Sequence, residues 1–254
     1  PILKEILSIN PSIKVIAAPW TCPKWMKVKS LTDLTPLDSW TNGQLNPAYY
    51  QDYATYFVKW VQAFNAEGID IYAVTPQNEP LNRGNSASLY MSWEEQRDFV
   101  KTALGPKFKT AGLATKIYAY DHNYDYSDIA TEKNYPGKMY EDAAASQYLA
   151  GAAYHNYGGN REELLNIHKA YPEKELLFTE TSIGTWNSGR DLSKRLLEDM
   201  KEVALGTINN WCRGVIVWNL MLDNDRAPNR EGGCQTCYGA VDISNSDYKT
   251  IIRN

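Results

Sequence analysis

The stretch Ile69-Asp70-Ile71-Tyr72-Ala73-Val74-Thr75-Pro76-Gln77-Asn78-Glu79-Pro80 decides the fold prediction for this sequence. Its first half is largely apolar and has the length of a buried strand. The two prolines disfavour a helix, so Glu79 is expected just beyond the end of that strand. A second run, Leu177-Phe178-Thr179-Glu180-Thr181, repeats the arrangement. Because parallel strands of α/β folds share one working face at their exits, we predict that Glu79 and Glu180 converge there.

Apolar runs of strand length alternate with longer segments of helical period along the whole chain. The predicted strands are residues 14–18, 70–75, 116–120, 151–154, 176–179 and 214–218. The predicted helices are residues 48–67, 93–104, 161–171 and 192–205, the first of them ended by Gly68. This alternation is typical of repeated βα units around a parallel sheet, and we expect an α/β fold.

Six βα units could form a doubly wound sheet, but functional-looking residues follow nearly every strand, as they do around the mouth of a barrel. A (β/α)8 TIM barrel needs eight strands. The chain also opens at Pro1, on what looks like the middle of a helix, without an initiator Met or a signal peptide. We therefore expect a partial barrel, truncated at both ends, with two N-terminal units and some C-terminal sequence absent.

Composition narrows the class of protein. The chain has 254 residues, 43% of them hydrophobic and 22% charged, which fits one α/β domain with one core. A net charge of -4 and the lack of a basic stripe argue against nucleic acid as a partner. No apolar run approaches the roughly 20 residues that span a bilayer. The excess of 8 Trp and 18 Tyr over 5 Phe suits stacking on sugar rings, although ordinary core and surface aromatics explain it as well.

Cys234 and Cys237 form a C-x-x-C pattern after two glycines, in a loop that opens no helix. No second pair completes a zinc site, and no His and carboxylate residues stand at the spacing of zinc ligands. A disulfide that ties the loop, or two free thiols, is favoured over redox catalysis. No phosphate-binding Gly-rich loop follows a strand, so we expect neither a metal nor a cofactor.

Two carboxyl groups are the requirement for cleaving a glycosidic bond. One protonates the departing oxygen and, in retaining enzymes, the other attacks the anomeric carbon. Glu79 and Glu180 suit these two roles. The alternative for any single glutamate is a solvated surface charge, which is the usual state of this residue type.

Five segments in order along the chain resemble the glucosylceramidase-like retaining glycoside hydrolases, glycoside hydrolase family 30, in a bacterial version. They are Ala18-Pro19-Trp20-Thr21-Cys22-Pro23-Lys24-Trp25-Met26-Lys27, Thr75 to Pro80, Tyr154-His155-Asn156-Tyr157, Phe178-Thr179-Glu180 and Val217-Trp218-Asn219-Leu220. The resemblance implies that residues 1–254 supply strands three to eight of a (β/α)8 barrel. It also implies that a β-sandwich built from both termini of the family is largely absent.

The resemblance implies a role for each matching residue. Glu79 corresponds to the acid/base after the fourth strand and Glu180 to the nucleophile after the seventh. Asn78 would bind the sugar 2-hydroxyl, which strengthens its contact as the ring flattens toward an oxocarbenium ion. Trp20 and Trp218 correspond to the aromatic walls of a glucose pocket, whereas Trp25 and Trp40 are assigned to packing.

Three further residues belong to the implied substrate site. His155 and Tyr157 match the sixth-strand motif of the family, although the position between them, usually aromatic, is Asn156. Tyr157 could donate a hydrogen bond to Glu180 and keep it ionised. His122, in the segment Tyr120-Asp121-His122-Asn123, resembles a loop that borders the pocket in bacterial members. The Cys234–Cys237 loop resembles one that flanks the sugar site.

These observations predict a retaining β-glycosidase that cleaves β-D-glucosidic bonds through a glycosyl ester on Glu180. A glucosylceramide-like glycolipid and β-1,6-glucan are both expected as substrates, and residues 80–85 favour the glucan. The alternatives are an inverting hydrolase, a catalytically dead carbohydrate-binding protein, and an inactive fragment of such an enzyme. The family resemblance alone implies a secreted or periplasmic location.

Overall fold

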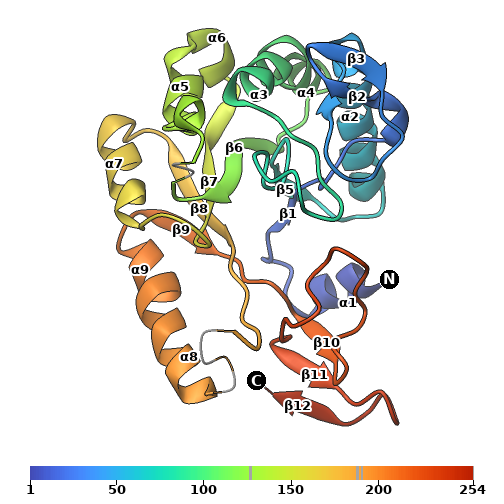
Figure 1. The fold of residues 1–254 in the computed structure, drawn as a ribbon, viewed down its shortest axis with the longest axis vertical. Helices are drawn as coiled ribbons and strands as arrows, with labels where there is room; N and C mark the ends of the chain where they lie inside the picture. Colours follow the sequence, from blue (N-terminus) through green and yellow to red (C-terminus); the bar gives the residue numbers. More distant parts are fainter. Residues whose placement is uncertain (126–127, 187–188, 190, 254) are drawn as a thin grey trace. The chain divides into compact units, whose positions relative to one another are not determined.

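The computed structural model describes residues 1–125, 128–186, 189 and 191–253, which divide into two compact units. The first unit comprises residues 1–121 and 134–152, and the second comprises residues 122–133 and 153–254. In Figure 1 the chain runs from blue in the first unit to red at the end of the second.

The strands belong to one large and two small sheets. The large sheet has the order β1 (Val15–Ala17), β5 (Ile71–Val74), β6 (Lys116–Asn123), β7 (Leu149–His155), β8 (Glu175–Glu180) and β9 (Cys212–Val215). The pairs β1–β5, β5–β6 and β8–β9 are parallel, with Ala73 opposite Lys116 and Leu176 opposite Cys212. The predicted parallel α/β sheet is therefore confirmed, and its strands follow one another in chain order, as in a partial barrel.

Helices fill the connections between these strands. In the first unit they are α1 (Ile2–Ile9), α2 (Tyr50–Ala66), α3 (Trp93–Phe99), α4 (Gly105–Thr110), α5 (Tyr135–Glu141) and α6 (Ala143–Ser146). In the second unit they are α7 (Glu162–Ala170), α8 (Leu192–Glu198) and α9 (Leu205–Ile208). Short 3-10 turns cover Lys24–Met26, Pro47–Tyr49 and Ala130–Glu132. Among the described residues, no helix has the length and apolar character that a bilayer crossing needs.

Helix α2 forms as its sequence predicts. Tyr53, Phe57 and Val61 recur every four residues, and all three side chains are buried. Gly68 ends the helix at φ +76°, donating its N–H to Asn65, while the next N–H bonds back to the Phe64 carbonyl. This Schellman arrangement satisfies carbonyls at the helix end and requires the left-handed conformation that glycine adopts without strain.

Several of the predicted elements differ in their ends, and two of them extend well beyond the predicted range. The helix predicted for residues 93–104 continues to Thr110. A π-helical turn over Val100–Leu104 precedes Gly105-Pro106, so the proline lies in the first turn of α4. The N–H that proline lacks is not needed there. The strand predicted for residues 116–120 runs on to Asn123 as β6 although Asp and Asn have low strand propensity. Just before this extension, the Tyr120 N–H donates to the Gln96 side chain at 2.8 Å.

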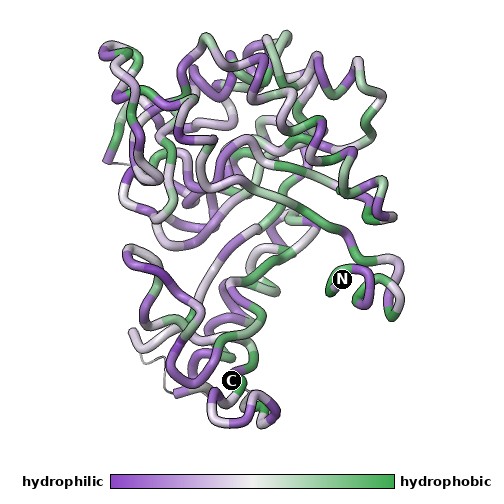
Figure 2. Tube along the Cα trace, turned by 90° about the vertical axis from the view of Figure 1, so that its right-hand side faces the viewer, coloured by the Kyte–Doolittle hydropathy of each residue, from purple (hydrophilic) through white to green (hydrophobic). Residues whose placement is uncertain are grey.

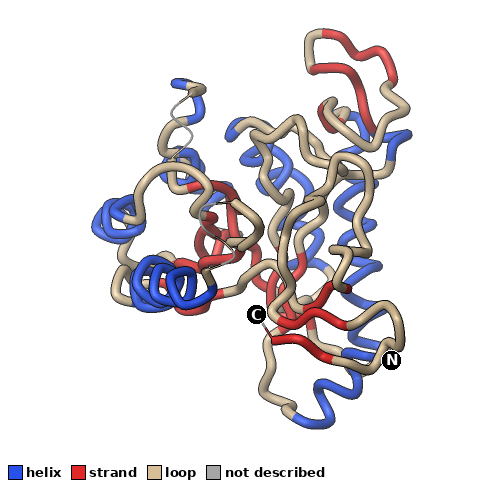
Figure 3. The backbone as a smooth tube through the Cα atoms, turned by 60° about the horizontal axis from the view of Figure 1, so that its bottom comes forward, coloured by secondary structure: helices blue, strands red, loops and turns tan. Residues whose placement is uncertain are grey.

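The two small sheets were not predicted. Strands β2 (Lys27–Ser30), β3 (Asp33–Pro36) and β4 (Gln44–Leu45) form an antiparallel sheet with the order β3-β2-β4, drawn in red at the top of Figure 3. Strands β10 (Met221–Asp223), β11 (Val241–Ile243) and β12 (Ile251–Arg253) form the other sheet, beside the C label of the same figure. These strands are two to four residues long, too short for a periodic hydrophobic pattern to reveal them.

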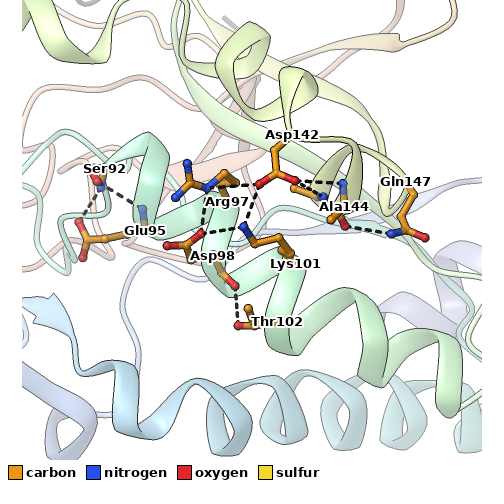
Figure 4. A network of polar contacts seen from close by, with 10 residues as sticks. Ser92, Glu95, Arg97, Asp98, Lys101, Thr102, Asp142, Ala144 and Gln147 are labelled. Atoms are coloured by element: carbon orange, nitrogen blue, oxygen red, sulfur yellow. Dashed lines mark hydrogen bonds and ion pairs between the residues drawn. The ribbon is translucent and has the colours of Figure 1, made fainter.

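A polar network around Asp142 joins three helices of the first unit (Figure 4). Asp142 Oδ2 lies 2.8 Å from Lys101 Nζ and 3.7 Å from Arg97 Nε. Asp142 Oδ1 accepts hydrogen bonds from the Ala144 and Ala145 N–H groups at the start of α6. The network lowers the pKa of Asp142, chiefly through the hydrogen bond from Lys101.

Helix α1, at the N label of Figure 2, is coloured largely as hydrophobic and has no buried residue.

Candidate active site

Asn78 and Glu79 follow β5 in the first unit, as the sequence predicts. The Asn78 N–H donates to the Pro19 carbonyl, and Gln77 Nε2 donates to the Trp20 carbonyl, so this turn is fixed against the exit of β1. Asn78 and Glu79 are both buried, with 5% and 6% of their surfaces exposed, and Trp20 is half-buried. The structure thus brings together the three predicted site residues that belong to this unit.

The Glu79 backbone lies in the left-handed region, with φ +45°. This conformation costs an L residue about 1–2 kcal/mol and is common at functional sites, where the surrounding structure holds it. Here the Glu79 N–H donates to the Asp121 carbonyl at 2.9 Å, while Asp121 Oδ2 accepts the Thr75 hydroxyl at 2.7 Å. Asp121 is buried and has a positive φ of its own, so it holds the turn that presents the glutamate.

A loop that follows Glu79 returns to its carboxyl group. Asn82 Nδ2 donates to Glu79 Oε2 at 2.8 Å, and Asn85 Nδ2 donates to the same oxygen. Neither asparagine was predicted as a site residue from the sequence. The signal available was a proline directly after the glutamate and a glycine at position 84, which together indicate a tight loop able to fold back.

The second unit gathers the other predicted residues near the ends of β6, β7 and β8. The rings of His122 and His155 have centroids 6.3 Å apart, and those of His155 and Tyr157 are 6.1 Å apart. Both histidines are buried, whereas Tyr157 is 45% exposed. Its hydroxyl lies 3.0 Å from Glu180 Oε1, and because an ionised carboxylate can only accept, the phenol donates. This is the hydrogen bond that the sequence analysis anticipated.

Glu180 is the last residue of β8 and is half-buried. The Tyr157 hydroxyl also lies 3.1 Å from Ser182 Oγ, a contact that the sequence did not indicate. The Trp218 N–H donates to the Thr181 carbonyl at 2.7 Å, so Trp218 stands beside the residues that follow Glu180. The regular strand β9 ends at Val215, earlier than predicted, and Trp218 is joined to Ser182 by an isolated bridge instead.

The C-x-x-C pattern is a disulfide between Cys234 and Cys237. Its loop is hydrogen-bonded to the segment after β8: the Tyr238 N–H donates to Ile183 at 2.8 Å, and the Thr185 N–H donates to Thr236 at 3.0 Å. The interpretation as a loop-tying disulfide is therefore confirmed. Trp25 packs edge to face on Tyr49, with ring centroids 5.1 Å apart, and Lys24 Nζ lies 5.5 Å from the centre of the Trp40 ring, although 62% and 48% of the two tryptophan surfaces are exposed. Their assignment to packing stays a prediction.

The family model for the glycosyl hydrolase family 30 TIM-barrel domain matches residues 1–245. The chain belongs to glycoside hydrolase family 30. The predicted TIM-barrel class is thereby confirmed, and the parallel sheet of the structure is the corresponding part of a family 30 barrel.

Three known proteins show what this chain is similar to. A solved structure titled "The endo-beta1,6-glucanase BT3312" is 90% identical with a TM-score of 0.98, over 100% of this chain and 56% of that one. Endo-1,6-beta-D-glucanase BGN16.3 of Trichoderma harzianum is 34% identical over 97% of this chain and 49% of its own length. Lysosomal acid glucosylceramidase of Mus musculus is 24% identical over 90% of this chain and 45% of its own length. The chain thus spans about half the length of the curated relatives it matches.

Proposed function

We propose that the protein containing this chain is a retaining β-glycoside hydrolase that cuts β-1,6-glucosidic bonds inside a glucan. The observation that carries the substrate choice is the 90% identity, over the full chain, with a protein titled an endo-beta1,6-glucanase. The more distant likeness to a glucosylceramidase makes a glycolipid the second candidate substrate. Both candidates share a β-linked glucose and require the same two carboxyl groups.

In the proposed first step, a carboxylate oxygen of Glu180 attacks the anomeric carbon, and Glu79 gives its proton to the departing glycosidic oxygen. The C–O bond to the leaving sugar breaks as the ester bond to Glu180 forms. In the second step Glu79 takes a proton from water, whose oxygen displaces Glu180 and restores the original configuration. The Tyr157 hydroxyl, 3.0 Å from Glu180 Oε1, supports this assignment because it stabilises the charged nucleophile.

Asn78 is proposed to bind the 2-hydroxyl of the reacting glucose. Its amide is 5% exposed, and its Nδ2 meets no hydrogen-bond partner within the described part of the chain. A buried donor left in this state costs about 1–3 kcal/mol, which a sugar hydroxyl would recover. Trp20 and Trp218 are proposed as the aromatic walls of the glucose pocket, and His122 and His155 as polar groups that border it.

The substrate is tested by incubating the full-length protein with β-1,6-glucan, with β-1,3-glucan and with glucosylceramide in detergent. We expect β-1,6-linked oligosaccharides from the first polymer and little product from the other two. Release of ceramide as the principal reaction would replace the glucan with the glycolipid. Binding of glucan without any product, by a protein whose circular dichroism shows it folded, would favour the carbohydrate-binding alternative.

The anomeric configuration of the first product distinguishes a retaining mechanism from an inverting one. Proton NMR of the first product formed from β-1,6-glucan is expected to show the β-anomer before mutarotation. An α-anomer formed first would indicate inversion, for which the two carboxyl groups stand roughly 6.5–9.5 Å apart rather than about 5–5.5 Å.

The proposed substrate bears on location. A glucan polymer supplied from outside the cell does not cross a bilayer, so an enzyme that cuts within it would meet it outside the cytoplasm. We therefore propose that the full-length protein is secreted or periplasmic. Fractionation of the source cells with an antibody to this chain tests this, and retention in the cytoplasmic fraction would contradict it.

A further inference from the structure

We propose that Asn82 and Asn85 are positioning residues that fix the rotamer of Glu79 and confine its acidic proton to Oε1. The proposal rests on the proposed function, in which Glu79 is the acid/base. Its basis is that the amide nitrogens of both residues donate to one and the same carboxyl oxygen, Oε2.

The orientation of the Asn82 amide is fixed by its other end. The Gly84 N–H donates to Asn82 Oδ1 at 3.0 Å, so the side-chain oxygen faces the loop backbone and the NH2 group faces Glu79. The Asn82 N–H donates to the Glu79 carbonyl at 2.9 Å, which closes a four-residue turn with Pro80 in its second position. The turn therefore returns Asn82 to the side chain that precedes it by three residues.

The rest of the loop is anchored, so the two amides are held before substrate arrives. The Arg83 guanidinium lies 3.7 Å from the centre of the Tyr90 ring, and its Nη1 donates to Asn42 Oδ1 at 2.9 Å. The Arg83 carbonyl accepts the Ser88 hydroxyl at 2.9 Å, and the Met91 N–H donates to Pro80 at 2.8 Å. Contacts at both ends of the loop limit the movement of Asn82 and Asn85.

Two N–H donors on Oε2 have a chemical consequence. An oxygen that accepts two hydrogen bonds has no place for a proton, so the neutral acid must carry its proton on Oε1. When Glu79 has delivered that proton, the same two donors stabilise the carboxylate that forms. The two asparagines thereby determine that Oε1 delivers the proton. They also favour release of that proton in the transition state, and this stabilisation lowers the activation barrier.

The test uses Asn82→Asp and Asn85→Asp in the full-length protein, because each change keeps the side-chain shape while replacing the donor with an acceptor. Two substrates are compared: β-1,6-glucan, whose leaving sugar needs protonation, and the dinitrophenyl β-glycoside of a β-1,6-linked glucose disaccharide, whose leaving group does not. We expect kcat/KM on glucan to fall about 10- to 100-fold, part of the roughly 10²–10⁴-fold that a general acid contributes. On the aryl glycoside it should fall less than about threefold, and the alkaline limb of the glucan pH profile should move upward by about one unit.

Arg83→Gln is the matched control. It weakens one anchor of the same loop but keeps both amide donors, and the contacts of Ser88, Met91 and the Gly84 N–H still hold the loop. Any effect should therefore be small and equal on the two substrates, with the alkaline limb unmoved. Equal losses on both substrates for Asn82→Asp and Asn85→Asp, without a shift of the alkaline limb, would overturn the proposal in favour of a merely structural role.

A Glu79→Gln arm separates failure of this inference from failure of the proposed function. If Glu79→Gln loses activity on glucan alone while the asparagine variants behave like Arg83→Gln, only the inference fails. If Glu79→Gln cleaves glucan at the wild-type rate, the assignment of the acid/base fails, and the inference fails with it.

Discussion

Glu79 and Glu180 follow parallel strands in the same manner along the sequence, yet their surroundings differ. Glu79 is buried, has a left-handed backbone, and receives two amide donors from a loop that begins at its own carbonyl. Glu180 ends a regular strand, is half-buried, and receives a phenol from the exit of the neighbouring strand. The donors of the first are local in sequence, whereas the donor of the second depends on the sheet.

The difference matches the two proposed tasks. A group that both gives and takes a proton benefits from donors crowded on one oxygen, since the other oxygen is then always the one that exchanges. A nucleophile must reach the reaction already ionised, and the Tyr157 hydroxyl stabilises the charge of Glu180 by donating to Oε1. Substitutions at the two glutamates and at their donors test this contrast.

The largest effect is expected for Glu180→Gln. Removal of the nucleophile should lower kcat by about 10⁵-fold on every substrate, because no glycosyl ester can form and the quality of the leaving group no longer matters. Steady-state rates on β-1,6-glucan and on the aryl glycoside measure it. A loss confined to glucan would mean that Glu180 has the role assigned to Glu79.

Glu79→Ala should lower the rate on glucan far more than the rate on the aryl glycoside. On glucan we expect a loss of roughly 10²–10⁴-fold, while formation of the glycosyl ester from the aryl glycoside stays near the wild-type rate, because an acidic phenol departs unprotonated. Azide should restore turnover of the aryl glycoside and give a β-glycosyl azide, since it needs no general base. If azide rescued Glu180→Ala with retained configuration, giving the β-glycosyl azide, and left Glu79→Ala unchanged, the two roles would be exchanged.

Tyr157→Phe should affect the nucleophile Glu180 and leave the acid/base Glu79 unchanged. It removes the O–H that lies 3.0 Å from Glu180 Oε1, and a hydrogen bond to a charged group contributes about 1.5–3 kcal/mol. We expect kcat/KM to fall about 10- to 100-fold on both substrates and the acidic limb of the pH profile to move upward. Ser182→Ala, which removes the second contact of the same phenol, is the milder comparison and should leave the acidic limb nearer its wild-type position.

The smallest effect concerns stability in the first unit. Burial raises the pKa of Glu95 to about 7, although Ser92 N–H and Gln44 Nε2 donate to its carboxyl group. Between about pH 4.5 and 7 the folded state therefore holds a proton that the unfolded state lacks, so the free energy of unfolding should fall as the pH rises through this window. The expected decrease is about 2–3 kcal/mol.

Glu95→Gln should remove most of this pH dependence, because the amide keeps the shape and an acceptor for Ser92 without titrating. Denaturant unfolding at pH 5, 6, 7 and 8 measures it, with Glu94→Gln on the same helical turn as the control. A Glu95→Gln variant with the same pH slope as the wild type would contradict the attribution to this carboxyl group.

The sequence predicted those features whose cause is local. The six parallel strands and the end of α2 at Gly68 follow from hydrophobic period and turn chemistry, and the structure contains them. The continuation of β6 through Asp121 and His122 could not be predicted, because these polar residues break the apolar pattern that indicates a buried strand.

The predicted site divides in a similar way. Glu79, Glu180 and the Tyr157 hydrogen bond to Glu180 were accessible from motifs at strand ends. Asn82 and Asn85 were not, because an asparagine in a loop is ordinarily read as a turn former, and only the coordinates show that both amides face one carboxyl oxygen. The substrate contacts of Asn78, Trp20, Trp218, His122 and His155 remain predictions.

The central claim, that Glu180 is the nucleophile of a retaining mechanism, is tested most directly by covalent trapping. The full-length protein is treated with a 2-deoxy-2-fluoro β-glycosyl fluoride, which forms the glycosyl ester faster than it is hydrolysed, and the digested protein is analysed by mass spectrometry. The account predicts one sugar per protein, attached to Glu180 and absent in Glu180→Gln. A sugar attached to Glu79, or an active protein that accumulates no adduct and releases the α-product first, would contradict it.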